Sequence, residues 1–168
     1  MLAIDGGTAV RTTPYPKRAL FGEQERDAAM ALFDQAVESG DPIGYNGPEE
    51  QAYEQAFAEW HGGGFADLVN SGTSALYVAL GGLELEPAGE VVIPPITDPG
   101  GAMPVALHNL VPVPADAAPG TFNIGGQQIA DVLTPHTRAI VVAHIAGEPA
   151  DMGPILELAN SRGIPVVE

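Results

Sequence analysis

From residue 63 onward, short apolar runs rich in β-branched residues alternate with segments that favour helix. The runs are FADLV, EVVIPP, LVPVPAD, RAIVVAHI and IPVVE, and the helical segments lie at 71–81, around 102–108 and at 151–161. Strands that alternate with helices predict a mainly parallel sheet with right-handed crossovers. Residues 91–93 and 139–143 are continuously apolar, which is typical of strands covered on both faces. The pattern predicts a three-layer α/β domain.

The first 62 residues read differently, as an extended arm followed by two helices. Residues 23–39 carry apolar side chains at helical spacing and stop at Gly40, and residues 48–60 begin at a proline suited to a first helical turn. We therefore expect a helical N-terminal arm over residues 1–62 and the first part of an α/β domain over residues 63–168.

The stretch NSGTSALYVAL, residues 70–80, predicts a turn from strand to helix that could hold an anion. A helix N-terminus presents unpaired N–H groups and about half a positive charge, which suits a phosphate. Gly72 would allow close approach, and the hydroxyls of Thr73 and Ser74 could add hydrogen bonds. Neither a P-loop nor a GxGxxG pattern is present. The alternative is that Ser71 is an ordinary N-cap before an apolar helix.

Composition and charge disfavour several classes of partner and location. The formal net charge of −16 disfavours nucleic acid and anionic membranes as partners, and its simplest consequence is solubility. The chain has no cysteine, and no apolar run approaches the ~20 residues that cross a bilayer. The N-terminus lacks the apolar core of a secretory signal, so a cytoplasmic protein is the default expectation.

Several blocks resemble, in order, the nucleotide-sugar aminotransferases of the DegT group, which are pyridoxal-phosphate enzymes of fold type I. The most specific are VNSGTSAL, EVVIPPITD, HIAGEPADM and the final GIPVVE. The resemblance implies pyridoxal 5′-phosphate as cofactor, with its phosphate held by Gly72, Thr73 and Ser74. It also implies an amino-acid donor, a keto-sugar acceptor that is commonly linked to a nucleotide, and a homodimer in the full-length form.

Three features depart from that pattern. The family's cofactor-binding lysine has no counterpart here, because the only lysine is Lys17 in the arm. The family's aspartate that pairs with the ring nitrogen, expected directly after the strand that ends at Glu168, has no counterpart either. Glu168 is one residue out of register to replace the aspartate. Asp98 stands where the family often has an aromatic residue that stacks on the cofactor, and it would more simply be a turn or cap residue. We therefore expect a truncated chain without catalytic residues of its own, inactive alone.

Two alternatives stay open. The chain could be a non-catalytic module that binds phosphate or another subunit, and the scaffold also serves deoxysugar dehydratases. His144, after a predicted buried strand, is either close to the site or a hydrogen-bonded structural histidine. The four histidines have no metal-ligand spacing, so no metal site is expected.

Overall fold

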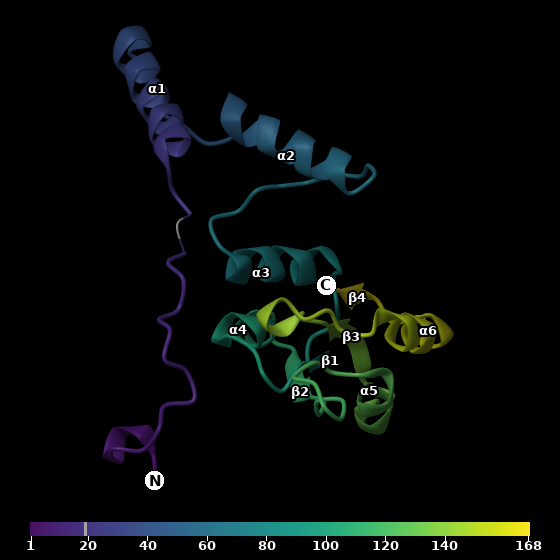
Figure 1. The fold of residues 1–168 in the computed structure, drawn as a ribbon. Coiled ribbons are helices and arrows are strands. Elements are labelled where there is room, and N and C mark those ends of the chain that lie inside the picture. Colours follow the sequence, from purple (N-terminus) through teal and green to yellow (C-terminus); the bar gives the residue numbers. More distant parts are fainter. Residues whose placement is uncertain (19) are drawn as a thin grey trace. The chain divides into compact units, whose positions relative to one another are not determined.

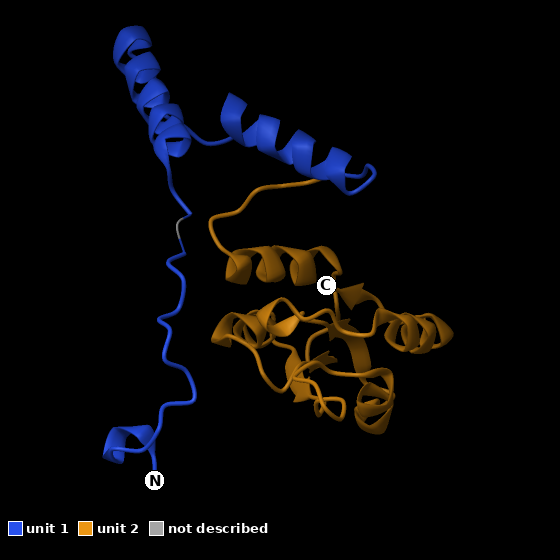
Figure 2. Ribbon diagram, viewed as in Figure 1, with its two compact units in different colours: residues 1–65 blue, residues 66–168 orange. Residues whose placement is uncertain are grey.

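The computed structural model describes residues 1–18 and 20–168, and these fall into two compact units. The first unit comprises residues 1–65 and the second comprises residues 66–168 (Figure 2).

The first unit contains a short 3-10 turn, Ala3–Asp5, and two helices, α1 at Glu23–Ser39 and α2 at Pro48–Trp60. Both helices have the predicted bounds. Helix α1 begins where the Gly22 N–H donates to the Glu25 carboxylate, and it ends at Gly40, whose φ of 76° is left-handed. No residue of either helix is buried.

The second unit is built on a parallel sheet (Figure 1). Its strands are β1 (Glu90–Ile93), β2 (Val111–Pro114), β3 (Thr137–Val141) and β4 (Val166–Val167), in the spatial order β2-β1-β3-β4. Every paired strand runs parallel to its neighbour, which confirms the predicted sheet. The carboxyl ends of all four strands therefore lie at one edge of the sheet.

Helices cover both faces, because alternate strand residues point in opposite directions. On one face, Val91 and Val141 join a buried cluster that includes residues of α3 (Gly72–Gly82) and α4 (Met103–Leu107). On the other face, Val92 and Ile140 join a cluster that includes residues of α5 (Gly126–Val132) and α6 (Met152–Arg162). The predicted three-layer α/β fold is confirmed.

Strand β2 forms one edge of the sheet. The Val111 N–H donates to the carbonyl of Gly89, just before β1, and the Ala115 N–H donates to the carbonyl of Ile93, at the end of β1. Since successive backbone amides of a strand point to opposite sides, the nitrogens of Pro112 and Pro114 face outward. This outer edge therefore has no N–H donor at either proline.

Two local predictions differ from the structure. Residues 65–69 do not form a strand, because they pair with none of the four strands, and ladder bonds to a neighbour define a strand. Helix α5 was not predicted, because its seven residues are too few to show a helical period. Its position depends on contact with α6, where a Cβ at Gly126 would lie 2.9 Å from the Cβ of Pro154.

Candidate functional site

A pocket of about 550 Å³ opens at the carboxyl ends of the strands, beside the start of α3. Pro94 follows β1 at its wall, Val142 and Ala143 follow β3, and Glu168 follows β4. Sites of open α/β sheets collect at this edge, because the loops that leave the strands converge there.

The first turn of α3 is organised by serine side chains. The Oγ of Ser71 accepts the Ser74 N–H at 3.1 Å, and the Ser74 hydroxyl donates to Oδ1 of Asn70 at 2.7 Å. The N–H groups of Gly72 and Thr73 donate in none of the hydrogen bonds found among the described residues. The predicted N-cap is thus present, and two of the helix's leading donors remain available beside it.

The three residues expected to hold a phosphate are placed unequally. Gly72 and Thr73 line the pocket, whereas the polar groups of Ser74 are engaged with Ser71 and Asn70. A Cβ added at Gly72 would meet no protein atom within 4 Å, so this position leaves open space for a ligand. The arrangement offers an anion two backbone donors and the Thr73 hydroxyl.

The charged residues among those described at the pocket wall are both acidic, Asp98 and Glu168. The Oδ1 of Asp98 accepts the Gly100 N–H at 3.0 Å and caps the 3-10 turn η2, Pro99–Gly101, which confirms its interpretation as a cap. With no lysine or arginine among these wall residues, the partial positive charge at the start of α3 is the favourable field for an anion here.

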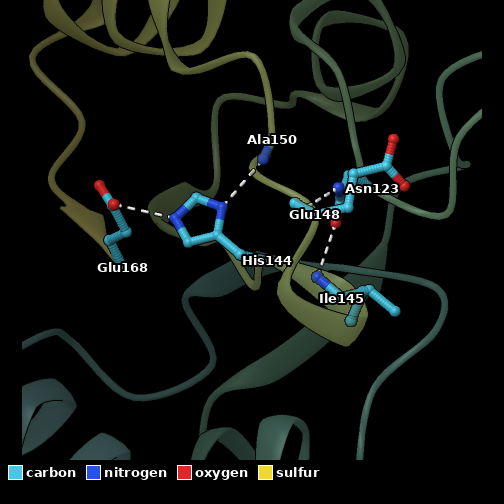
Figure 3. Close-up of polar contacts among 6 residues, drawn as sticks. All are labelled: Asn123, His144, Ile145, Glu148, Ala150 and Glu168. Atoms are coloured by element: carbon cyan, nitrogen blue, oxygen red, sulfur yellow. Dashed lines mark hydrogen bonds and ion pairs between the residues drawn. The ribbon is translucent and has the colours of Figure 1, made fainter.

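His144 is a hydrogen-bonded structural histidine (Figure 3), and it directly follows Ala143, which lines the pocket. The Ala150 N–H donates to its Nδ1 at 2.9 Å, and its Nε2 lies 2.9 Å from Oε1 of Glu168. This confirms one of the two interpretations of His144, and its place after β3 also puts it close to the site. Glu168, the residue set aside on register, lies at the pocket wall with its carboxylate bound to His144.

No local sequence pattern points to a role for Asn123. Only 3% of this residue is exposed, and its side-chain amide bonds the backbone of Ile145 and Glu148 in the loop after β3. It sits in the turn-rich stretch TFNIGG, where asparagine is common, so only the folded chain reveals its long-range partners.

Two further properties concern the part of the chain that the structure describes. No cluster of three His, Cys, Asp or Glu side chains there could hold a metal ion. No helix there combines the length and apolar character needed to cross a membrane.

The site lies within the segment that matches a known family. The model of the DegT/DnrJ/EryC1/StrS aminotransferase family matches residues 23–168. The chain belongs to this family.

Relatives within the DegT/DnrJ/EryC1/StrS family include GDP-perosamine synthase of Caulobacter vibrioides, which is 37% identical over 116 residues, 69% of this chain and 31% of that protein. The L-glutamine:2-deoxy-scyllo-inosose aminotransferase of Micromonospora echinospora is 32% identical over 174 aligned positions, 100% of this chain and 40% of that protein. The chain thus spans about two fifths or less of the length of these relatives.

Solved structures share the fold. The X-ray structure of the aminotransferase from Psychrobacter cryohalolentis matches with a TM-score of 0.81 and 33% identity, covering 91% of this chain and 38% of that one. The crystal structure of NtdA from Bacillus subtilis with bound cofactor PMP also matches with a TM-score of 0.81, at 25% identity, covering 95% of this chain and 36% of that one. The sequence resemblance to the DegT group is confirmed.

Proposed function

We propose that this chain provides the phosphate-binding part of a pyridoxal 5′-phosphate-dependent aminotransferase of amino-sugar biosynthesis. The enzyme would move an amino group from an amino acid to a keto-sugar that is linked to a nucleotide, and it would work in the cytoplasm. One observation carries the proposal, namely the two unpaired amides of Gly72 and Thr73 at the pocket wall, at the start of α3.

The residues present fit the phosphate end of this cofactor. Gly72 leaves space for close approach, and the two amides with the Thr73 hydroxyl supply donors at the positive end of a helix. Ser74, the third residue of the expected set, would contribute its hydroxyl only after leaving Asn70. The ring of the bound cofactor supplies an electron sink for the carbon that exchanges its amino group.

The names of the relatives support the class of reaction. The Micromonospora protein is named as an aminotransferase that uses L-glutamine, and the Caulobacter protein as a synthase of an amino sugar linked to GDP. We propose corresponding partners here: an amino-acid donor, a keto-sugar acceptor and, in the full-length form, a second copy of the chain. Sedimentation equilibrium of the longer protein would give a monomeric mass if the dimer proposal is wrong.

We propose further that these 168 residues do not turn over substrate alone. None of the described wall residues is a lysine, and Lys17 is the chain's single lysine. The lysine that the family resemblance implies as the proton carrier is therefore absent from the described wall residues. The lysine-free wall equally suits the alternative of a non-catalytic phosphate-binding module derived from the family.

The test compares pyridoxamine 5′-phosphate with pyridoxamine, which lacks only the phosphate. The amine forms of the cofactor avoid aldehyde adducts with Lys17 and the N-terminus. Calorimetry should show tighter binding of the phosphorylated compound. Thr73→Val, which keeps the shape and removes the hydroxyl, should weaken that binding by about tenfold, as expected for a lost hydrogen bond to a charged group.

The control is Thr134→Val, because the Thr134 hydroxyl donates to the Glu90 carboxylate and accepts the His136 N–H before the start of β3, and it is not at the pocket wall. Its affinity for pyridoxamine 5′-phosphate should equal that of the unaltered chain. Equal binding of the two pyridoxamine compounds would refute the phosphate site. Transamination by the 168-residue chain alone would refute the proposed inactivity and the non-catalytic alternative.

A further inference from the structure

The loop that follows β3 is held in an unusual backbone conformation. It contains the short turn η3, Ile145–Gly147, in which Ala146 has φ 55° and Gly147 has φ 83°. A left-handed φ is uncommon for alanine, so the surrounding structure must hold this loop.

Asn123 holds this loop from inside the fold (Figure 3). Its Oδ1 accepts the Ile145 N–H at 2.9 Å, and its Nδ2 donates to the Glu148 carbonyl at 2.8 Å. The opposite orientation of the amide would place donor against donor and acceptor against acceptor. One nearly buried side chain therefore fixes both ends of η3.

His144, the residue before η3, is fixed in one tautomer. Because Nδ1 accepts the Ala150 N–H, that nitrogen carries no proton, and the ring proton is on Nε2. Nε2 then donates to Oε1 of Glu168. Figure 3 shows the ring between these two partners, so His144 joins the segment after β3 to the end of β4.

This contact lies at the pocket. Val142 and Ala143 line the wall immediately before His144, and Glu168 lines it from β4. The Nε2–H of His144 partly offsets the charge of the Glu168 carboxylate. A carboxylate released from His144 would therefore be a mobile and less compensated negative charge in the pocket where α3's amides face an anion. Like charges in one pocket repel each other, and this repulsion lowers the affinity for a phosphate.

We propose that His144 is a positioning residue, which in its Nε2–H tautomer holds the Glu168 carboxylate in place at the pocket wall, on a loop that Asn123 fixes. The inference rests on the proposed function in one respect, that the pocket takes a phosphorylated pyridine compound. Neither residue is assigned a direct contact with that compound.

Two substitutions at His144 separate its contacts. His144→Asn keeps an acceptor near Nδ1 for the Ala150 N–H but does not reach Glu168. His144→Gln keeps a donor near Nε2 for Glu168 but loses the acceptor for Ala150. We expect His144→Asn to weaken binding of pyridoxamine 5′-phosphate by about fivefold through the freed charge, and His144→Gln to weaken it less. The Ala150 amide should exchange its hydrogen faster in His144→Gln, which lacks the acceptor for it, than in His144→Asn.

The decisive variant adds Glu168→Gln to His144→Asn, which removes the freed charge and should restore most of the lost affinity. A simple loss of folding would not be rescued in this way, and circular dichroism of each variant checks its fold. No loss of affinity in His144→Asn, or a loss that Glu168→Gln does not restore, would overturn the proposal.

Nitrogen-15 chemical shifts of the His144 ring give a readout that needs no ligand. An unprotonated Nδ1 and a protonated Nε2 are expected, and Glu168→Gln should move the Nε2 signal. A proton on Nδ1, or an Nε2 signal indifferent to Glu168→Gln, would overturn the positioning role. If the unaltered chain binds no pyridoxamine 5′-phosphate, the proposed function fails, and these nitrogen shifts still decide the role of His144.

Discussion

At the pocket wall, Thr73 and Gly100 fit against each other. A Cβ built on Gly100 would lie 2.3 Å from Oγ1 of Thr73, far inside van der Waals contact. The turn that holds Gly100 is fixed by Asp98, which accepts the Gly100 N–H. The absence of a side chain at residue 100 therefore sets where the Thr73 hydroxyl can lie.

Gly100→Ala should consequently displace the Thr73 side chain and weaken binding of pyridoxamine 5′-phosphate about as much as Thr73→Val does, roughly tenfold. Gly82→Ala is the matched control, because a Cβ there meets no atom within 4 Å. Calorimetry of both variants measures the difference. Unchanged affinity in Gly100→Ala would show that the hydroxyl does not act from this position.

The residues of the site differ in how far sequence reasoning could find them. Gly72 and Thr73 follow from local chemistry, because a helix start with a serine cap leaves amides free whatever the fold. Asn123 and the pair His144–Glu168 do not, since their hydrogen bonds span 22 to 25 residues of chain. Contacts of that kind depend on strand order, which no local pattern encodes.

Among the elements, helices with strong terminal signals were predictable. Pro48 and Gly40 mark helix ends because proline suits a first turn and glycine adopts a left-handed φ. The segment FADLV has strand-like composition, yet none of the four strands pairs with residues 65–69. Composition alone cannot supply a ladder partner, and a seven-residue helix such as α5 depends on its neighbour more than on its period.

The start of α1 gives a prediction about pH. The Gly22 N–H, and then the Glu25 N–H, donate to the Glu25 carboxylate and hold its pKa below the ordinary value of 4.5. A lowered pKa means that this stabilisation is present above pH 4.5 and is lost as the pH falls through the folded pKa. Carbon-13 NMR of the Glu25 carboxyl should give a midpoint below 4.5, with the Gly22 amide signal moving in parallel.

Glu25→Gln is the control for that titration, because a neutral amide can still accept the Gly22 N–H but does not ionise over this range. The Gly22 amide signal should then lose its acid transition. A Glu25 midpoint at or above 4.5 would mean that the carboxylate does not hold the Gly22 N–H in solution.

For the molecule as a whole, the alternation of apolar runs and helical segments was enough to predict the fold class. The apolar strands and the helices between them pack into two buried clusters, one on each face of the sheet. The net charge of −16 has its own consequence, since a phosphate must approach a strongly acidic protein. The attraction at α3 acts over short distances, whereas the repulsion from the whole chain acts over long ones.

Salt should therefore strengthen binding of pyridoxamine 5′-phosphate, in contrast to a site built from lysine and arginine. Raising the ionic strength from about 10 mM to about 150 mM shortens the screening length to about 8 Å and should raise the affinity about twofold. The salt should have a bulky anion that cannot enter the pocket, and calorimetry gives the affinity at each step. A fall of several-fold would indicate a basic group at the site.

The paired prolines of β2 also restrict how this protein meets other chains. A neighbouring strand that approached Pro112 and Pro114 from outside could donate its N–H groups to their carbonyls. Its own carbonyls would find no N–H donor at either proline, so an alternating ladder of hydrogen bonds could not form there. Strand-to-strand aggregation is thereby blocked along this border without any charged side chain. The same two residues therefore disfavour the addition of a further strand to the sheet beside β2.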